Sequence, residues 1–353
     1  MKIAFIVGAR PQFIKLGPLA EKIRDHFKEV IIHTGQHFDQ NMSAMFFKDL
    51  SLPPPDYNLN INCRSHGEQT GKMMIELEKV LQSECPSLGI VFGDTNSTLA
   101  GSLVCSKLHI PTIHIEAGLR SFNREMPEEI NRIVSDHTSD FLFAPTQTAM
   151  QNLEREGLSE KAFLTGDIMV DALMDNIERA DQVSSILETK GLVAEKYYLV
   201  TLHRPYNVDD PVKLNKLLTK FSKIGAQVIF PVHPRTRKVM DDHSMVIPEN
   251  VLLSEPVGYL DFIKLESCSM KIITDSGGIQ KEAYLLKKPC ITIRPETEWI
   301  ETVKQGWNVL VDVDSDDFVN TIETFNPSQK QDDLFGKNVA QKMFDKIQKI
   351  MSG

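Results

Sequence analysis

Short, continuously apolar segments recur along this chain, with helix-like segments between them. In the first half they cover residues 3–7, 30–33, 90–92, 112–115 and 141–144, and in the second half residues 198–202, 228–232, 251–254, 272–274, 290–293 and 308–311. Continuous rather than alternating apolar character is typical of strands buried on both faces, as in parallel sheets wrapped by helices. The pattern therefore predicts an α/β fold with two parallel sheets, one in each half of the chain.

The length of the chain, 353 residues, is too great for one ordinary hydrophobic core and fits two domains. Between the two sets of apolar segments, residues 167–194 begin with a helical pattern and then become polar, which indicates a boundary. We predict one Rossmann-like domain over residues 1–170 and a second over residues 171–335. Residues 336–353 carry a helical apolar stripe, and we expect this C-terminal helix to pack back across the domains.

The composition argues against several classes of protein. A net charge of -9 disfavours a nucleic-acid surface, so an anionic ligand must be held by a local cluster of cations and helix N-termini. No apolar stretch approaches the roughly 18 residues of a membrane span, and the first residues turn polar too soon for a signal peptide. The five cysteines are scattered, so we expect neither disulfides nor a metal site. These features predict a cytoplasmic protein without a membrane or nucleic-acid partner.

Carboxylates stand where two apolar segments end. Asp94 follows residues 88–93, Glu116 follows residues 112–115, and Glu128 lies a little further on. The carboxyl ends of parallel strands share one edge of a sheet, so these side chains are expected to gather there as an acid/base site. The structural alternatives are a helix cap for Asp94 and a first-turn position for Glu128, and taken singly these positions favour them. Glu116 is harder to explain structurally, because it directly follows a buried strand.

A glycine-rich turn in the second half is typical of phosphate binding. Residues 272–282 have the pattern of a strand, a Ser276-Gly277-Gly278 turn and a helix start. The two glycines let backbone N–H groups approach an anion, and the helix N-terminus adds positive potential. This predicts a diphosphate cradle, with Glu282 one turn further on to accept hydrogen bonds from a ribose. An ordinary strand-to-helix turn with a solvated glutamate is equally compatible with this motif alone.

Cationic side chains also follow strand ends in both halves. They are Arg10 and Lys15 after the first apolar segment, His203 and Arg204 after residues 198–202, and His233 after residues 228–232. Solvated surface positions are the commoner fate of Arg and Lys, and a lone strand-end histidine is more often structural. Two such histidines with nearby arginines favour an anion site.

Taken together, these motifs resemble the non-hydrolysing UDP-N-acetylglucosamine 2-epimerase family over nearly the whole chain. The matching motifs are Gly8-x-Arg10-Pro11 with Lys15, Gly93-Asp94-Thr95, His114-x-Glu116-Ala-Gly-Leu-Arg120, Pro127-Glu-Glu-x-Asn-Arg132, His203-Arg204 and Asp275-Ser-Gly-Gly-Ile-Gln280. The resemblance implies a GT-B-type architecture, in which two Rossmann-like domains face each other across the active-site cleft, and a homodimer. It implies no metal and no cofactor.

The resemblance also implies roles for individual residues. It assigns catalysis to Asp94, Glu116, Glu128 and His203, the last beside the leaving diphosphate. It assigns binding of the UDP-sugar to Arg10, Lys15, Arg132, Arg204, His233, Ser276, Gly277, Gly278, Glu282 and Arg294. The implied reaction is anti elimination of UDP across C1 and C2 to a 2-acetamidoglucal, followed by reprotonation on the other face of C2 and re-addition of UDP. Such chemistry needs carboxylates for the weakly acidic C2–H and cations that retain UDP.

The chain departs from the best-known branch of that family, whose bacterial members are activated by UDP-N-acetylglucosamine bound beside the substrate. Gln36 is kept, but Asp39 stands where a second glutamine belongs, and Glu68 replaces an arginine. A carboxylate near a diphosphate repels it, which argues against this activation and leaves it an open question. Lys281 likewise stands where an acidic residue is usual.

Three segments, residues 9–15, 296–301 and 306–308, look more like the branch that epimerises UDP-2,3-diacetamido-2,3-dideoxyglucuronic acid. We expect UDP-N-acetylglucosamine as the substrate, with the diacetamido-uronate as the alternative. A hydrolysing epimerase, a GT-B glycosyltransferase and a non-catalytic nucleotide-sugar sensor are further alternatives. The three carboxylates favour proton transfer over acceptor activation, which commonly needs one base.

Overall fold

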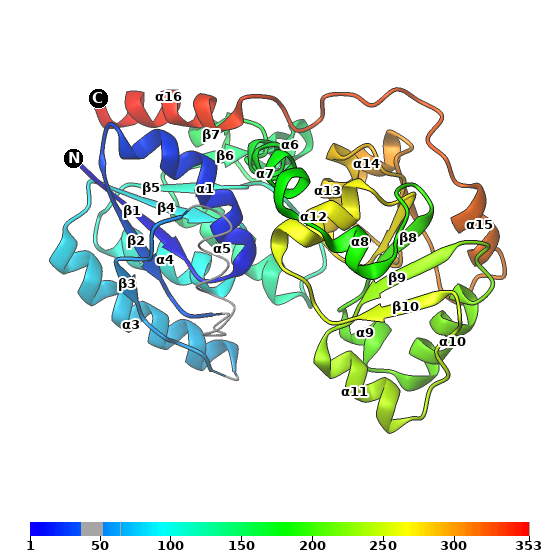
Figure 1. Cartoon of the computed structure of the whole chain (residues 1–353). Coiled ribbons are helices and arrows are strands. Elements are labelled where there is room, and N and C mark those ends of the chain that lie inside the picture. Colours follow the sequence, from blue (N-terminus) through cyan, green and yellow to red (C-terminus); the bar gives the residue numbers. More distant parts are fainter. Residues whose placement is uncertain (37–51, 64, 353) are drawn as a thin grey trace. The chain divides into compact units, whose positions relative to one another are not determined.

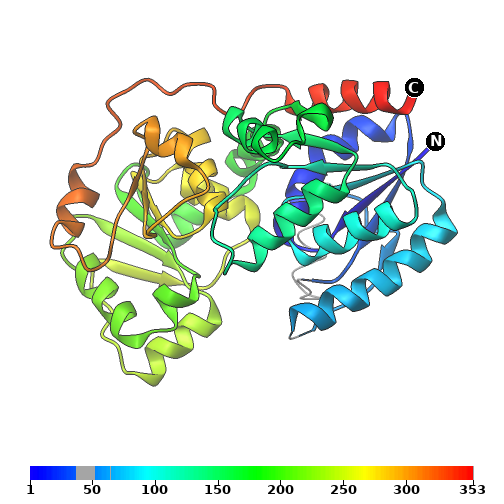
Figure 2. The same ribbon diagram turned by 180° about the vertical axis from the view of Figure 1, so that it is seen from behind.

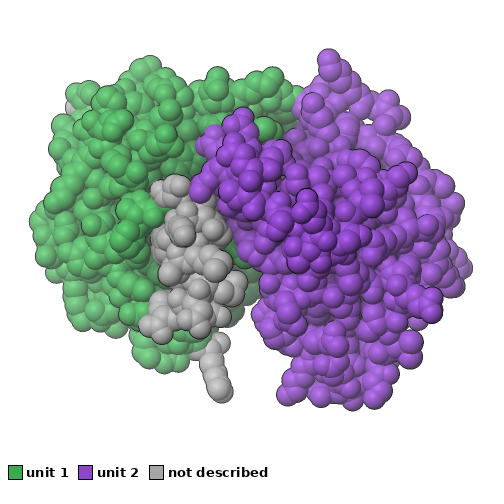
Figure 3. Space-filling model, in the orientation of Figure 1, with its two compact units in different colours: residues 1–174, 333–353 green, residues 175–332 purple. Residues whose placement is uncertain are grey.

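The computed structural model describes residues 1–36, 52–63 and 65–352. The chain divides into two compact units, Met1–Met174 with Asp333–Gly353, and Asp175–Asp332 (Figure 3). The last residues thus belong to the same unit as the first. Within the described residues, no helix has the length and apolar character needed to cross a membrane.

The first unit contains a seven-stranded parallel sheet of order β3-β2-β1-β4-β5-β6-β7. Its strands are β1 (Lys2–Val7), β2 (Lys28–His33), β3 (Tyr57–Asn58), β4 (Leu88–Phe92), β5 (Thr112–Ile115), β6 (Phe141–Ala144) and β7 (Ala162–Leu164). The central strands β1, β4 and β5 are almost wholly buried, as continuous apolar segments predict. The sequence pattern missed β3 and β7, because strands of two or three residues leave almost no apolar run.

Helices cover this sheet and connect its strands (Figures 1 and 2). They are α1 (Arg10–Arg24), α3 (His66–Glu84), α4 (Asn96–Lys107), α5 (Pro127–Thr138), α6 (Gln147–Arg155), the 3-10 turn η1 (Ser159–Lys161), the start of α7 (Met169–Val183) and α16 (Val339–Ser352). The apolar stripe of α16 buries Val339, Met343 and Ile347, and the helix runs along α1 (Figure 1). There the rings of His26 and Phe344 have centroids 4.9 Å apart.

The second unit contains a six-stranded parallel sheet of order β10-β9-β8-β11-β12-β13. Its strands are β8 (Tyr197–Thr201), β9 (Gln227–Pro231), β10 (Val251–Ser254), β11 (Lys271–Thr274), β12 (Cys290–Thr292) and β13 (Asn308–Leu310). Its helices are the rest of α7, α8 (Ile186–Lys190), α9 (Pro205–Val208), α10 (Pro211–Phe221), α11 (Pro234–Asp242), α12 (Tyr259–Ser267), α13 (Gly277–Leu285), α14 (Ile300–Lys304) and α15 (Phe318–Thr324). The predicted α/β class with two parallel sheets is confirmed.

Each sheet reverses its strand order beside its first strand. The chain leaves β1 towards β2 on one side and returns to β4 on the other, and β8 stands in the same way between β9 and β11. In open α/β sheets, ligands bind beyond the carboxyl ends of strands at such a switch point. The ends of β1, β4 and β5 in the first unit, and of β8, β11 and β12 in the second, are therefore where functional residues are expected.

Candidate active site

The turn after β1 is tied to the end of β4 by Gln12. Its Oε1 accepts hydrogen bonds from the backbone N–H groups of Gly8 (2.7 Å) and Ala9 (3.0 Å), while its Nε2 donates to the carbonyl of Phe92 (2.7 Å). Gln12 is 1% exposed, so these bonds satisfy a fully buried amide. The residue fixes the start of α1, where half-buried Arg10 takes the first helical position. Sequence reasoning missed Gln12, although a polar residue directly after a strand-end turn was a signal.

Lys15 and Glu116 form an ion pair at the carboxyl ends of the central strands. The Nζ atom of Lys15 contacts Oε2 of Glu116, and their side chains are only 10% and 9% exposed. Glu116 has a φ of 73°, a left-handed conformation that non-glycine residues rarely adopt. Such strain clusters at functional sites, where surrounding structure enforces it. The turn thus aims the Glu116 carboxylate at Lys15.

Gly93, at the end of β4, leaves room for this pair. Its φ is 64°, and a Cβ atom at this position would lie 3.2 Å from Oε2 of Glu116 and 3.4 Å from Nζ of Lys15. Any side chain here would both strain the backbone and crowd the ion pair. Asp94 follows directly, so the carboxylates of Asp94 and Glu116 stand at the ends of neighbouring strands, as the sequence predicts.

Asp94 is held by α5. Its Oδ2 lies 2.6 Å from Nη2 of Arg132, and its backbone carbonyl accepts a hydrogen bond from Nδ2 of Asn131 (2.9 Å). The helix cap that was the structural alternative for Asp94 is supplied by Thr95, whose side chain accepts from the N–H of Thr98. The Asp94 carboxylate therefore does not cap α4. It is about one-third exposed, and its charge is paired with that of Arg132.

The two glutamates at the start of α5 have different environments. Glu129 is 1% exposed and accepts hydrogen bonds from the backbone of Ser121 (2.9 Å) and Phe122 (2.9 Å) and from Arg132 (2.9 Å). Burial raises the pKa of Glu129, but these hydrogen bonds and the arginine charge hold it below its ordinary value. Glu129 therefore holds the backbone before α5 in place. Glu128 is half-buried and lies one helical turn before Arg132, on the same face of α5.

In the second unit, Asp275 organises the residues that follow β8. It is fully buried and accepts from the backbone N–H groups of His203 (3.1 Å) and Arg204 (3.1 Å) and from Nδ2 of Asn207 (2.9 Å). Nδ1 of His203 lies 3.2 Å from its Oδ1. Burial raises the pKa of Asp275, but His203, Asn207 and Arg204 hold it below its ordinary value. The arrangement orients the exposed His203 ring in the manner of an Asp–His pair.

The glycine-rich turn forms the N-terminus of α13, as the sequence predicts. Ser276 is the N-cap residue and its side chain makes no capping hydrogen bond. Gly277 is packed tightly, since a Cβ atom there would lie 2.0 Å from Oε1 of Glu298. Glu298 pairs with Arg294 at 3.0 Å, just beyond β12. The predicted residues Ser276, Gly277 and Arg294 are therefore neighbours around one helix N-terminus.

Two arginines near this turn retain buried donor atoms. Nε of Arg204 and Nη1 of Arg294 are buried and have no hydrogen-bond partner among the described residues. The charges of both guanidinium groups lower the pKa of Tyr206, although burial, the largest effect, and the charges of Asp275 and Glu298 raise it overall. Unfilled N–H donors on cations beside a helix N-terminus are suited to an anion such as a phosphate.

Glu282 lies within α13 and is 6% exposed. It interacts with Glu266 of α12, which is fully buried. Burial, and then the charge of Glu282, raise the pKa of Glu266 well above its ordinary value. Sequence reasoning missed Glu266, because a glutamate inside a helical pattern normally indicates a solvated face.

Other predicted positions have local partners. His233 is exposed and caps α11, its Nδ1 accepting from the N–H of Arg235. Gln36 accepts from the N–H (3.0 Å) and the hydroxyl (2.7 Å) of Ser97, whereas Asp39 lies outside the described residues. Glu68 is exposed and pairs with Lys72 at 2.7 Å. The carboxylate at position 68 thus faces a lysine of its own helix.

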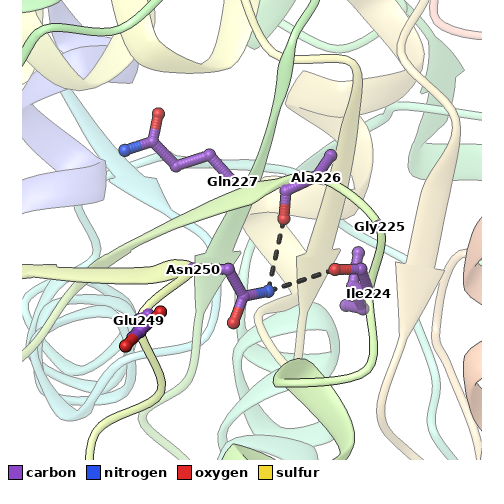
Figure 4. A pocket seen from close by; sticks show the side chains of 6 residues that line it. All are labelled: Ile224, Gly225, Ala226, Gln227, Glu249 and Asn250. Atoms are coloured by element: carbon purple, nitrogen blue, oxygen red, sulfur yellow. Dashed lines mark hydrogen bonds between the residues drawn. The ribbon is translucent and has the colours of Figure 1, made fainter.

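A shallow pocket in the second unit lies away from the residues described above. It is lined by Ile224, Gly225, Ala226, Gln227, Glu249 and Asn250 at the amino end of β9, opposite to the strand ends described above (Figure 4). Nδ2 of Asn250 donates to the carbonyls of Phe221, Ile224 and Ala226. Its polar side chain is therefore occupied in closing the turn. Among the described residues, no group of three or more His, Cys, Asp or Glu side chains could hold a metal ion.

Comparison with known proteins gives a consistent result. A family model described as UDP-N-acetylglucosamine 2-epimerase matches residues 21–348. The UDP-N-acetylglucosamine 2-epimerase homolog of Methanococcus maripaludis is 49% identical, over 94% of both chains. The UDP-2,3-diacetamido-2,3-dideoxy-D-glucuronate 2-epimerase of Pseudomonas aeruginosa is 47% identical, over 95% of this chain and 96% of its own.

A solved structure is similar over the full length. The crystal structure of Methanocaldococcus jannaschii UDP-GlcNAc 2-epimerase in complex with UDP-GlcNAc and UDP has a TM-score of 0.91 and 43% identity, with 100% of each chain covered. This likeness confirms the predicted GT-B type of fold. With a family model that spans most of the chain and relatives close to half identical, this protein belongs to the UDP-N-acetylglucosamine 2-epimerase family.

Proposed function

We propose that this protein interconverts UDP-N-acetylglucosamine and UDP-N-acetylmannosamine by eliminating UDP to a 2-acetamidoglucal and adding it back. The observation that carries the proposal is the strained Glu116, paired with Lys15 beside Gly93 and Asp94 at the ends of neighbouring strands. A binding protein has no need for several carboxylates held with cations at one sheet edge. Proton transfer at carbon does need them, because the C2–H bond is only weakly acidic.

The first unit supplies the proton-transfer groups in this proposal. Glu116 is paired with Lys15, and Asp94 is paired with Arg132. Glu128, half-buried on the same helix as Arg132, is the third member of the set. One group removes the C2 proton and another returns a proton to the opposite face.

The second unit supplies the nucleotide-binding groups. The unfilled donors of Arg204 and Arg294 and the N-terminus of α13 are assigned to the diphosphate, with His203 beside the leaving oxygen. Glu282, in the first turns of the same helix, is assigned to the ribose hydroxyls. These contacts must hold UDP after the C1–O bond breaks, because a released UDP cannot be added back.

The sugar itself has two candidates. The family model and the M. jannaschii structure, which is a complex with UDP-GlcNAc and UDP, support UDP-N-acetylglucosamine. The P. aeruginosa relative, at 47% identity, supports the diacetamido-uronate as a second substrate. We also propose that the protein is a homodimer and that it lies in the cytoplasm. The five cysteines of the chain are free, which is compatible with a reducing compartment.

The deciding experiment is an exchange reaction in deuterated water. The full-length protein is incubated with UDP-N-acetylglucosamine, and in parallel with the diacetamido-uronate, and the sugar is followed by NMR. Deuterium at C2 together with the C2 epimer supports the proposal and identifies the preferred substrate. Release of free N-acetylmannosamine would instead indicate hydrolysis, and no exchange at C2 with either sugar would exclude the proposed reaction.

A further inference from the structure

His114 lies in β5, two residues before Glu116, and is completely buried. Its Nδ1 is 2.7 Å from Oδ1 of Asp136, and its Nε2 is 2.7 Å from the carbonyl oxygen of Gly93. Both distances are short for hydrogen bonds from nitrogen to oxygen. The ring therefore joins α5, through Asp136, to the end of β4.

Both partners of the ring are hydrogen-bond acceptors. The Gly93 carbonyl has no proton to donate, and Asp136 is ionised, since it also accepts from Nη2 of Arg120 (2.7 Å) and from the N–H of Gly118 (3.0 Å). Burial raises the pKa of Asp136, but His114 and Arg120 hold it below its ordinary value. A neutral imidazole has one N–H donor and one acceptor, so it would set a lone pair against an oxygen. Turning the ring over would place carbon atoms at both oxygens.

We infer that His114 is a permanently protonated imidazolium that positions the catalytic carboxylates and never exchanges a proton with the substrate. The histidine charge is paired directly with the Asp136 carboxylate, and the neighbouring Arg120 guanidinium contacts both Asp136 and Glu156 (2.7 Å each). A buried charge is tolerated when it is paired and hydrogen-bonded in this way.

The other groups around His114 and Asp136 agree with this assignment. In the neighbouring strands, the residues in register with His114 are Val91 and Leu142, which are apolar. Nζ of Lys161, in η1, donates to the backbone carbonyls of Asp136 (2.9 Å) and Ser139 (2.6 Å). The side-chain oxygens of Asp136 contact His114, Arg120 and the N–H of Gly118.

The position of His114 explains what the charge does. One N–H holds the carbonyl of Gly93, immediately before Asp94, and the other holds the carboxylate that binds Gly118, two residues after Glu116. Asp136 also lies on α5, the helix that carries Arg132. His114 therefore connects the three segments that bear the carboxylates proposed above. The inference rests on the proposed function for its catalytic consequence, but the protonation state itself does not.

The protonation state is tested by NMR of the full-length protein labelled with ¹⁵N in its histidine rings. At a pH of about 8, an ordinary histidine is neutral, because its pKa is about 6.5. We expect two protonated ring nitrogens for His114, with its signals assigned by their loss in His114→Asn or in His114→Gln. His33 is an internal control, because it is also buried but burial lowers its pKa to about 4, so it shows a single protonated nitrogen. A neutral His114 ring would overturn the inference.

The positioning role is tested with two variants that each keep one of the bonds. In His114→Asn, the side-chain amide can replace Nδ1 and keep the hydrogen bond to Asp136. In His114→Gln, the longer side-chain amide can replace Nε2 and keep the hydrogen bond to the Gly93 carbonyl. We expect kcat and deuterium exchange at C2 to fall at least tenfold in both, since misplacing catalytic groups by about 1 Å has effects up to 100-fold. UDP affinity is expected to stay within twofold, because the residues proposed to hold the diphosphate and the ribose, Arg204, Arg294 and Glu282, are in the other unit.

The outcomes separate the two hypotheses. A parallel loss of UDP affinity, or unchanged exchange at C2 in both variants, would overturn the positioning role. If the wild-type protein exchanges no deuterium at C2 but His114 carries two ring protons, the proposed function fails and the protonation state stands. If the variants do not fold, the NMR measurement on the wild-type protein still decides the assignment.

Discussion

Nη2 of Arg132 lies 2.6 Å from Oδ2 of Asp94, and Nη1 of the same guanidinium lies 2.9 Å from Oε2 of Glu129. One buried arginine therefore ties the end of β4 to the first turn of α5. A planar guanidinium can serve two carboxylates in fixed directions, which a lysine ammonium on a flexible stem does not do. Together with Lys15 at Glu116, this gives each strand-end carboxylate its own cation.

Arg132→Lys is expected to keep the positive charge and lose this geometry. We expect kcat to fall at least tenfold, because Asp94 and Glu129 lose their fixed partner, while UDP affinity stays within twofold, because the positive charge is kept. Steady-state kinetics and calorimetric UDP titration measure the two effects. The matched control is Arg24→Lys, which alters the pair of exposed Arg24 with half-buried Glu29 (2.8 Å) and should leave both quantities unchanged. Equal losses in both variants would contradict the assigned role of Arg132.

Glu116→Gln is expected to lower deuterium exchange at C2 by about 10²–10⁴-fold, the usual contribution of a positioned acid or base. The amide is nearly isosteric, so folding and UDP affinity should be preserved. Glu76→Gln, which removes an exposed carboxylate paired with Lys79, is the control and should retain full exchange. Wild-type exchange in Glu116→Gln would remove this residue from the proton-transfer groups.

Gly93→Ala tests the space beside the ion pair. Forcing a Cβ atom into a left-handed conformation costs about 1–2 kcal/mol, and here the atom would also approach Glu116 and Lys15. Gly191 has almost the same φ, 63° against 64°, but nothing within 4 Å of its Cβ position. We expect both alanine variants to lose similar stability on thermal unfolding and only Gly93→Ala to lose activity. Equal activities would show that the space beside Glu116 is not needed.

Glu282→Ala should weaken UDP binding by about 1–3 kcal/mol, through loss of hydrogen bonds to a charged group. Titration calorimetry with UDP gives this difference directly. Deuterium exchange at saturating substrate should be reduced much less than by Glu116→Gln. An unchanged UDP affinity would remove Glu282 from the ribose site.

Glu266→Gln should stabilise the protein at neutral and alkaline pH. The pKa of Glu266 is raised in the folded state, first by burial and then by Glu282, so folding takes up a proton once the unfolded carboxyl is ionised. Its contribution to stability is therefore lost as the pH rises above about 4.5, by about 1.4 kcal/mol per pH unit until the folded pKa is reached. Denaturant unfolding at pH 5 and pH 8 should show a larger gain for Glu266→Gln at pH 8. A gain that does not depend on pH would show that Glu266 is not held protonated.

Most strands and the strand-end residues were predictable, because buried parallel strands leave continuous apolar runs that end in polar residues. Asp94, Glu116 and Ser276 could be identified in this way. Glu129 and Asp136 could not, since a buried polar residue within a helix looks the same in sequence as one facing solvent. What such a side chain binds depends on which backbone groups of other segments lie beside it in the folded protein.

The sequence by itself determined the α/β class, the two parallel sheets and the carboxylates and cations at their strand ends, because each follows from local periodicity and turn chemistry. Only the tertiary structure decided how these groups are paired. Lys15 pairs with Glu116, and Arg132 pairs with Asp94. His114 bonds to Gly93, 21 residues before it, and to Asp136, 22 residues after it. Such pairings arise when the sheet order places distant strand ends side by side, and it is burial that makes each pairing obligatory.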